Sequence, residues 1–213
     1  MASLLPAINA YTEEEFVERA QLLRALNVRC IQLDISDGIF GIPENFSNPE
    51  IAARELPGMK LDIHLMARDV LAAIAVWHKI LPVRITVHIE VLRDPRAVLE
   101  QIRTAGSERG LALGPQTPVE TVQPHLREID FLLFVAVPPG RSGQRLDPET
   151  PSRIQTVRQQ YPHLPIGVDG GVTATVVPQL LAAGATTITV ASALFSAPDP
   201  KAAYAELKRL VEA

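Results

Sequence analysis

Short apolar or β-branched runs alternate along the chain with longer amphipathic stretches. The short runs have the length and composition of strands, several of them buried on both faces. They cover residues 4–8, 30–35, 60–66, 83–89, 111–114, 131–137, 165–169 and 186–191. Apolar residues at helical spacing between them predict helices, most clearly over residues 12–26, 94–105, 172–183 and 200–211.

Eight strands alternating with eight helical segments predict an α/β protein with a single (βα)₈ TIM barrel. A barrel of this kind can be built from 213 residues, near the lower end of its usual length. An open, doubly wound parallel sheet is the competing architecture. No shift in composition divides the chain, so residues 1–213 are expected to form one domain.

Composition narrows the range of partners. The chain has 24 acidic and 20 basic residues, a net charge of −4, which argues against nucleic-acid binding. No apolar run approaches the roughly 18 residues of a membrane span, and the first ten residues lack the basic segment of a signal peptide. Cys30 is the only cysteine, so an intramolecular disulfide is impossible and a reducing, cytoplasmic location is expected.

Candidate chemistry lies at the C-terminal ends of the predicted strands, where barrels carry their active sites. Asp34, His64 and Asp169 each lie within a mostly apolar strand, where an unpaired buried charge is costly. Gln32 has the parity of Asp34, and Met66 that of His64, so each pair faces one side. A divalent cation is the simplest common partner for side chains converging on one barrel mouth.

Two other ionisable residues near strand ends have simpler interpretations. Asp37 is expected to cap a turn or a helix, and His88 to be a hydrogen-bonded core histidine.

Glycine-bearing segments after the last three predicted strands indicate a phosphate site. Residues 138–144 follow the sixth strand, residues 170–171 are expected to open the helix after the seventh, and residues 191–192 follow the eighth. Backbone N–H groups in such loops hold anions without a basic patch. The candidate phosphate-binding residues are Gly140, Arg141, Ser142, Gly143, Gln144, Gly170, Gly171, Ala191 and Ser192.

Six motifs in order, from about Pro6 to Leu210, resemble those of ribulose-phosphate 3-epimerases. Leu-Asp-Ile-Ser-Asp-Gly (33–38) is similar to the family's Val-Asp-Val-Met-Asp-Gly, and Asp-Ile-His-Leu-Met (62–66) to Asp-Val-His-Leu-Met. Ala-Leu-Gly-Pro-Gln-Thr-Pro-Val-Glu (112–120) and Pro-Gly-Arg-Ser-Gly-Gln (139–144) match two loop motifs. Val-Asp-Gly-Gly-Val (168–172) and Ala-Ser-Ala-Leu-Phe (191–195) match the last two.

The resemblance implies a barrel of the ribulose-phosphate-binding type that interconverts D-ribulose 5-phosphate and D-xylulose 5-phosphate at C3. It implies that Asp34 and Asp169 transfer protons on opposite faces of a planar enediolate, with Met66 packing nearby. It implies a divalent metal (Zn, Mn, Mg or Fe) held by Asp34, His64 and Asp169, with Gln32 as a fourth candidate. A phosphorylated ketose as substrate and assembly into a homo-oligomer are also implied.

The sequence departs from the family pattern around the sugar pocket. Gln32 replaces the family's usual first metal-ligating histidine, and the other altered positions are Ala7, Ala10, Ser36, Ile39 and Val135. A glutamine oxygen would tilt metal preference from Zn²⁺ toward Mn²⁺ or Mg²⁺, or weaken binding. A metal-free site is a further alternative, as is a Gln32 that only hydrogen-bonds a neighbour.

Two other functions are compatible with these motifs: an epimerase of another ketose phosphate, such as a hexulose 6-phosphate, and a non-catalytic phosphosugar-binding barrel. Retention of both Asp34 and Asp169 favours a catalyst. The Asp-x-Lys-x-x-Asp strand usual in hexulose-phosphate synthases and orotidine-phosphate decarboxylases is absent, because residues 62–66 carry no lysine. Arg141 is expected to supplement the phosphate site through its guanidinium.

Overall fold

Eight parallel strands close into a barrel in the order of the sequence. The computed structural model describes residues 2–139 and 143–213. The strands are β1 (Ser3–Ile8), β2 (Cys30–Ser36), β3 (Lys60–Met66), β4 (Arg84–His88), β5 (Glu108–Leu113), β6 (Phe131–Val135), β7 (Ile166–Asp169) and β8 (Thr187–Val190). Pairing of β1 with β8 closes the sheet, so the predicted barrel is confirmed and the open sheet is excluded.

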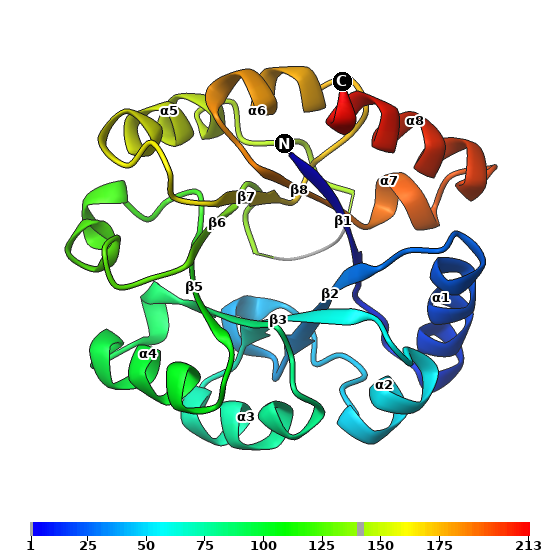
Figure 1. The fold of residues 1–213 in the computed structure, drawn as a ribbon, viewed down its shortest axis with the longest axis horizontal. Helices are drawn as coiled ribbons and strands as arrows, with labels where there is room; N and C mark the ends of the chain where they lie inside the picture. The colour runs from blue at the N-terminus through cyan, green and yellow to red at the C-terminus, as the bar shows by residue number, and fades with distance from the viewer. Residues whose placement is uncertain (1, 140–142) are drawn as a thin grey trace.

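Helices surround the strands on the outside (Figure 1). They are α1 (Glu13–Ala25), α2 (Pro49–Glu55), α3 (Val70–Trp77), α4 (Pro95–Thr104), α5 (Thr150–Gln160), α6 (Val177–Ala183), α7 (Ser192–Phe195) and α8 (Pro200–Glu212). At the start of several helices, a side-chain oxygen accepts a hydrogen bond from a backbone N–H of the first turn, which stabilises the helix. These capping residues are Thr12, Asn48, Asp69, Asp94 and Asp199.

Helix α6 begins five residues later than the hydrophobic pattern predicts. It starts at Val177, and Pro178 lies in its first turn, where the missing N–H of proline costs nothing. The expectation that Gly170 and Gly171 open this helix is therefore wrong, because a loop separates them from it.

The connection between β5 and β6 also departs from the expected helix. It consists of two short 3₁₀ turns, η4 (Val119–Thr121) and η5 (Gln123–His125). Pro118 precedes the first turn and Pro124 lies within the second. Prolines so closely spaced cannot continue an α-helix, because they lack the N–H donor.

A buried ion pair lies inside the barrel, near the N-terminal ends of its strands. Asp62 on β3, 1% exposed, accepts hydrogen bonds from the guanidinium of its cross-strand neighbour Arg84. That guanidinium lies 3.5 Å from the centre of the Phe131 ring, close enough for a cation–π contact. This ion pair forms the floor of the barrel interior. His64 and Met66 are the next two inward-facing side chains of β3, so they lie above it.

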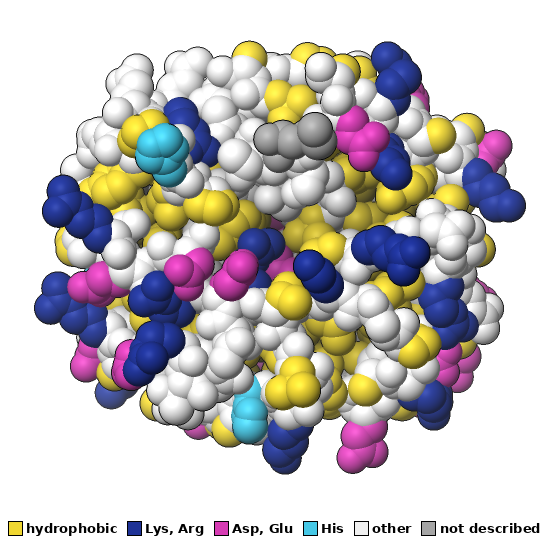
Figure 2. Space-filling model, in the orientation of Figure 1, with side chains coloured by type: hydrophobic (Ala, Val, Ile, Leu, Met, Phe, Trp, Pro, Cys, Tyr) yellow, Lys and Arg dark blue, Asp and Glu magenta, His cyan; other side chains and the backbone are white. Residues whose placement is uncertain are grey.

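Basic and acidic side chains are interspersed on the face shown in Figure 2. This mixture accords with the small net charge of −4. Within residues 2–139 and 143–213, no helix combines the length and apolar character needed to cross a membrane.

Candidate active site

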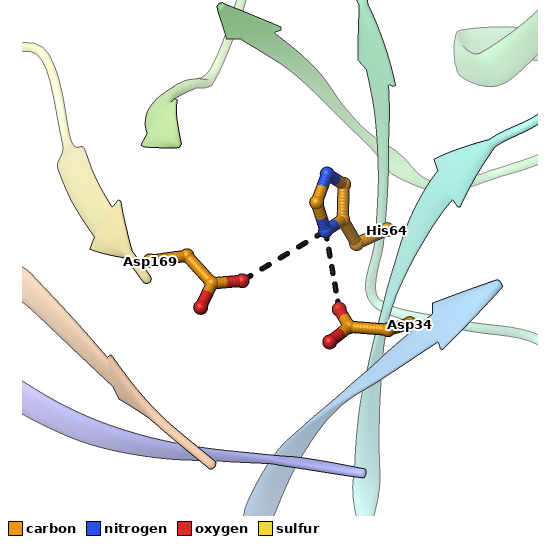
Figure 3. Close-up of side chains that lie close together, drawn as sticks. All are labelled: Asp34, His64 and Asp169. Carbon is orange, nitrogen blue, oxygen red and sulfur yellow. Dashed lines mark hydrogen bonds and ion pairs between the residues drawn. The ribbon is translucent and has the colours of Figure 1, made fainter. Parts of the chain in front are cut away.

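Three side chains from three strands converge inside the barrel (Figure 3). Asp34 and His64 are cross-strand neighbours on β2 and β3, and Asp169 ends β7. The Nδ1 atom of His64 lies 3.1 Å from Oδ1 of Asp34 and 3.9 Å from Oδ2 of Asp169. The convergence expected from their strand positions is therefore present.

Gln32 joins the two carboxylates. Its Nε2 atom donates to Oδ1 of Asp34 at 2.7 Å and to Oδ2 of Asp169 at 2.6 Å. Its Oε1 atom accepts a hydrogen bond from the Thr189 hydroxyl at 3.3 Å. Gln32 is 1% exposed, so these hydrogen bonds compensate for burying its amide. Gln32 therefore pairs with both carboxylates.

Burial and nearby charges shift the pKa values of Asp169 and His64. Burial, and then the negative charge of Asp34, raise the pKa of Asp169 to about 6. Burial lowers the pKa of His64, but the hydrogen bond and charge of Asp34, with the charge of Asp169, outweigh it and hold that pKa above its ordinary value. The site therefore attracts positive charge, as a proton or as a cation.

The donor set fits a divalent cation. One ligand atom from each of Asp34, His64 and Asp169 lies within 4.8 Å of the others, and carboxylate oxygen with imidazole nitrogen suits Zn²⁺, Mn²⁺ or Fe²⁺. Gln32 presents its NH₂ group to the carboxylates, so it would ligate only after its amide turned to present Oε1. Thr189 can accommodate that turn, because a hydroxyl both donates and accepts.

His88 and Glu90 extend the buried polar cluster away from the carboxylates. Nε2 of His88 lies 2.9 Å from Nε2 of His64, and Nδ1 of His88 lies 3.2 Å from Oε2 of Glu90. Burial lowers the pKa of His88. Burial raises the pKa of Glu90, but hydrogen bonds from His88, Gly114 and Thr117 outweigh it and lower that pKa to about 2. His88 is hydrogen-bonded and 6% exposed, as expected, but it also lines the cavity shared by Asp34 and Asp169.

A cavity of about 280 Å³ opens above these side chains. Asp34 and Asp169 line it, together with predicted site residues from the following loops. Those predicted residues are Met66, Gly143, Gln144, Gly170, Gly171, Ala191 and Ser192. Gly140, Arg141 and Ser142 lie outside the described residues. The capping role expected of Asp37 is confirmed, because its carboxylate accepts from the backbone N–H groups of Ile39 and Arg68.

The positions that depart from the family pattern lie at different depths. Ala7, Ala10 and Ser36 are buried, at most 2% exposed, whereas Val135 lines the cavity. Ile39 lies in the 3₁₀ turn after β2. The next residue along the chain, Phe40, reaches the cavity instead.

Sequence reasoning missed several residues of the cavity wall, among them Glu90, Phe40 and Thr189. Phe40 has a φ of 60° and packs its ring against His88, with centroids 4.9 Å apart. A bulky residue at positive φ is unusual and often marks a functional site, but no local sequence pattern reveals it. Thr189 could have been found from its inward parity on β8.

Comparison with known proteins identifies the family of this barrel. The model of the ribulose-phosphate 3 epimerase family matches residues 1–195. The chain belongs to this family. It is 30% identical to the cytoplasmic isoform of ribulose-phosphate 3-epimerase from Oryza sativa, over 99% of this chain and 95% of that protein. It is 32% identical to the Mycobacterium leprae enzyme of the same name, over 84% and 82% of the two chains.

The family assignment makes the chain an epimerase, an enzyme of the isomerase class. Solved structures support the fold alone. A 3-hexulose-6-phosphate synthase superposes with a TM-score of 0.74 at 17% identity, covering 99% of this chain and all of that one. The orotidine 5′-phosphate decarboxylase of Pyrococcus horikoshii gives 0.73 at 16% identity, with 99% and 100% coverage.

Proposed function

We propose that this epimerase interconverts D-ribulose 5-phosphate and D-xylulose 5-phosphate at C3. The observation that carries the proposal is the placement of two carboxylates, Asp34 and Asp169, on one cavity with a single amide joining them. Inversion at a carbon next to a ketone needs one group to remove a proton and another to return one from the opposite side. Two carboxyl groups facing one cavity meet that need.

The raised pKa of Asp169 suits this reaction. One carboxylate takes the C3 proton, and the electrons of the C3–H bond form the enediolate with negative charge on the C2 oxygen. The other carboxyl group, protonated, then delivers its proton to C3 from the opposite face. Asp169, with its pKa raised to about 6, holds a proton more readily than an ordinary aspartate. The roles exchange in the reverse direction.

A divalent cation bound by Asp34, His64 and Asp169, with Gln32 as a fourth candidate, would stabilise negative charge on the substrate oxygen. The NH₂ group of Gln32 holds both carboxylates in one orientation through hydrogen bonds. Met66, 6% exposed, contributes an apolar surface to the cavity beside them.

The loops after β6, β7 and β8 are proposed to hold the phosphate group. Gly143, Gly170, Gly171 and Ser192 line the part of the cavity wall that these loops form. Gly171 has a φ of 68°, and a Cβ there would lie 2.3 Å from the backbone nitrogen of Leu146. Only glycine allows these two loops to approach so closely.

Proton NMR in D₂O of the purified protein with D-ribulose 5-phosphate, a hexulose 6-phosphate or unphosphorylated ribulose tests this function. We expect D-xylulose 5-phosphate from the first, with little turnover of the sugar that lacks phosphate. Faster epimerisation of the hexulose 6-phosphate would redirect the proposal to that substrate. Binding of all phosphorylated sugars without loss of any C3–H signal would show a binding protein instead.

A further inference from the structure

A row of hydrogen bonds leads from Glu90 to the candidate metal-binding nitrogen of His64. Oε1 of Glu90 accepts hydrogen bonds from the backbone N–H of Gly114, at 2.7 Å, and from the hydroxyl of Thr117. Its other oxygen, Oε2, faces Nδ1 of His88 at 3.2 Å. Two donors already satisfy Oε1, so Glu90 is held with Oε2 directed at the histidine.

The chemistry of each group fixes where the protons lie. An ionised carboxylate only accepts, so Nδ1 of His88 must carry hydrogen. A neutral imidazole has one N–H, and Nε2 of His88 is therefore an acceptor. That atom faces Nε2 of His64 at 2.9 Å, so Nε2 of His64 must donate. Nδ1 of His64 is the other ring nitrogen, and it faces Asp34 and Asp169. A cation bound there would replace the hydrogen that Nδ1 directs at Asp34, while the hydrogen on Nε2 stays in place.

We propose that Glu90 and His88 are positioning residues that hold His64 with Nε2 protonated and Nδ1 presented to the cation. The inference deepens the proposed function and rests on it only for the role of the cation. Carboxylate and carbonyl partners of metal-binding histidines fix ring orientation in this way. Here the carboxylate acts through a second histidine, 6% exposed.

The opposite arrangement of protons would disable the site. If His88 carried its hydrogen on Nε2, its Nδ1 lone pair would face the Glu90 carboxylate, which is repulsive. Nε2 of His64 would then accept, and Nδ1 would carry a hydrogen directed at Asp34. A cation bound at Nδ1 requires the hydrogen of His64 on Nε2, where it would face the Nε2 hydrogen of His88 across 2.9 Å.

Replacing Glu90 by glutamine should produce this reversal with almost no change of shape. The amide oxygen would keep the hydrogen bonds from Gly114 and Thr117, which need an acceptor. The NH₂ group would then replace Oε2 and donate to Nδ1 of His88. We expect Glu90→Gln to switch His88 to the tautomer protonated on Nε2. Glu128→Gln is the matched control, because Glu128 faces Nδ1 of His125 at 3.4 Å in the η5 region.

Nitrogen-15 NMR of the histidine rings at neutral pH, without metal or substrate, reads the tautomers directly. His88 is expected to be protonated on Nδ1 in the wild type and in Glu128→Gln, and on Nε2 in Glu90→Gln. Signals are assigned by their loss in His88→Gln and His64→Gln. A wild-type His88 protonated on Nε2, or no switch in Glu90→Gln, would overturn the proposal.

Calorimetric titration of the chelated proteins with Zn²⁺ and Mn²⁺ gives a second readout. Glu90→Gln should weaken metal binding about 10- to 100-fold, whereas Glu128→Gln should bind as the wild type does. Equal affinity in all three proteins would contradict the proposed link to the cation. If the wild type binds neither metal, the proposed presentation of Nδ1 to a cation is overturned. Neither readout uses substrate, so a failed epimerase assay would leave this test intact.

Discussion

Gln32 is the residue that most separates this site from the pattern of its family. Its amide nitrogen lies within 2.7 Å of both Asp34 and Asp169, where it supplies two hydrogen-bond donors to two carboxylates. A cation at the same place would supply charge as well. We therefore expect Gln32 to influence how strongly the carboxylates need a metal.

Restoring an imidazole at this position should strengthen zinc binding. Gln32→His would complete a set of two histidines and two aspartates without changing the formal charge, and such a set suits Zn²⁺. We expect more zinc per protein after purification and tighter binding after chelation, measured by elemental analysis and calorimetry. Gln116→His adds an imidazole elsewhere on the cavity wall and should leave zinc content unchanged. Equal zinc in all three proteins would contradict this role of Gln32.

Asp169 should make the stability of the metal-free protein depend on pH. Its folded-state pKa of about 6 lies above the ordinary value of 3.8, so the folded protein binds this proton more tightly than the unfolded chain. The resulting stabilisation is fully present below the ordinary pKa and is lost as the pH rises through about 6. Urea unfolding after chelation should show that loss in the wild type and a smaller one in Asp169→Asn. Parallel profiles would contradict the shift.

The site residues differ in how far the sequence reveals them. Asp34, His64 and Asp169 could be predicted because charged side chains in apolar strands are costly without a partner. The pairing of Glu90 with Gly114 and Thr117 could not, because it joins side chain and loop across 24 and 27 positions of the chain. Local spacing carries no signal for such contacts.

At the scale of elements, the strands were predictable and several of their ends were not. Runs of apolar residues located every strand of the barrel. Strand β4 stops at His88 because Ile89 begins a 3₁₀ turn, a change that an apolar pattern does not show. The late start of α6 could have been inferred from Pro178, since proline is tolerated only in the first turn of a helix.

The ion pair between Asp62 on β3 and Arg84 on β4 should matter for stability mainly when one partner is removed without the other. Arg84→Met leaves the carboxylate of Asp62 buried without its partner, and breaking a buried pair costs about 3–5 kcal/mol. The double variant Asp62→Leu with Arg84→Met removes both charges and should recover most of that loss. Urea unfolding of both variants measures the difference. Equal destabilisation of the single and double variants would contradict this account of the barrel floor.

At the scale of the whole molecule, the barrel places a stabilising ion pair and the candidate active site at different depths of its interior. Asp62 and Arg84 close the interior near one end of the strands, and the candidate active site lies above that floor. Backbone N–H groups, in loops such as that of Gly171, are the expected phosphate contacts, with Arg141 as the expected supplement. The single-domain organisation, the homo-oligomer and the cytoplasmic location stay predictions, which mass in solution and cell fractionation would test.

The central claim is that Asp34 and Asp169 act on opposite faces of the substrate. The most direct test follows C3 by NMR as the protein converts D-ribulose 5-phosphate in D₂O. Early in the reaction, two separate groups should place solvent deuterium in the D-xylulose 5-phosphate formed while the remaining substrate keeps its C3 hydrogen.

Asp34→Asn and Asp169→Asn should each slow epimerisation by about 10²- to 10⁴-fold, the usual contribution of a positioned acid or base. A variant that keeps one active carboxylate should still exchange the C3 hydrogen of one epimer for solvent deuterium, without inverting that carbon. Product without deuterium early in the wild-type reaction, or turnover near the wild-type rate in either variant, would contradict the two-carboxylate account.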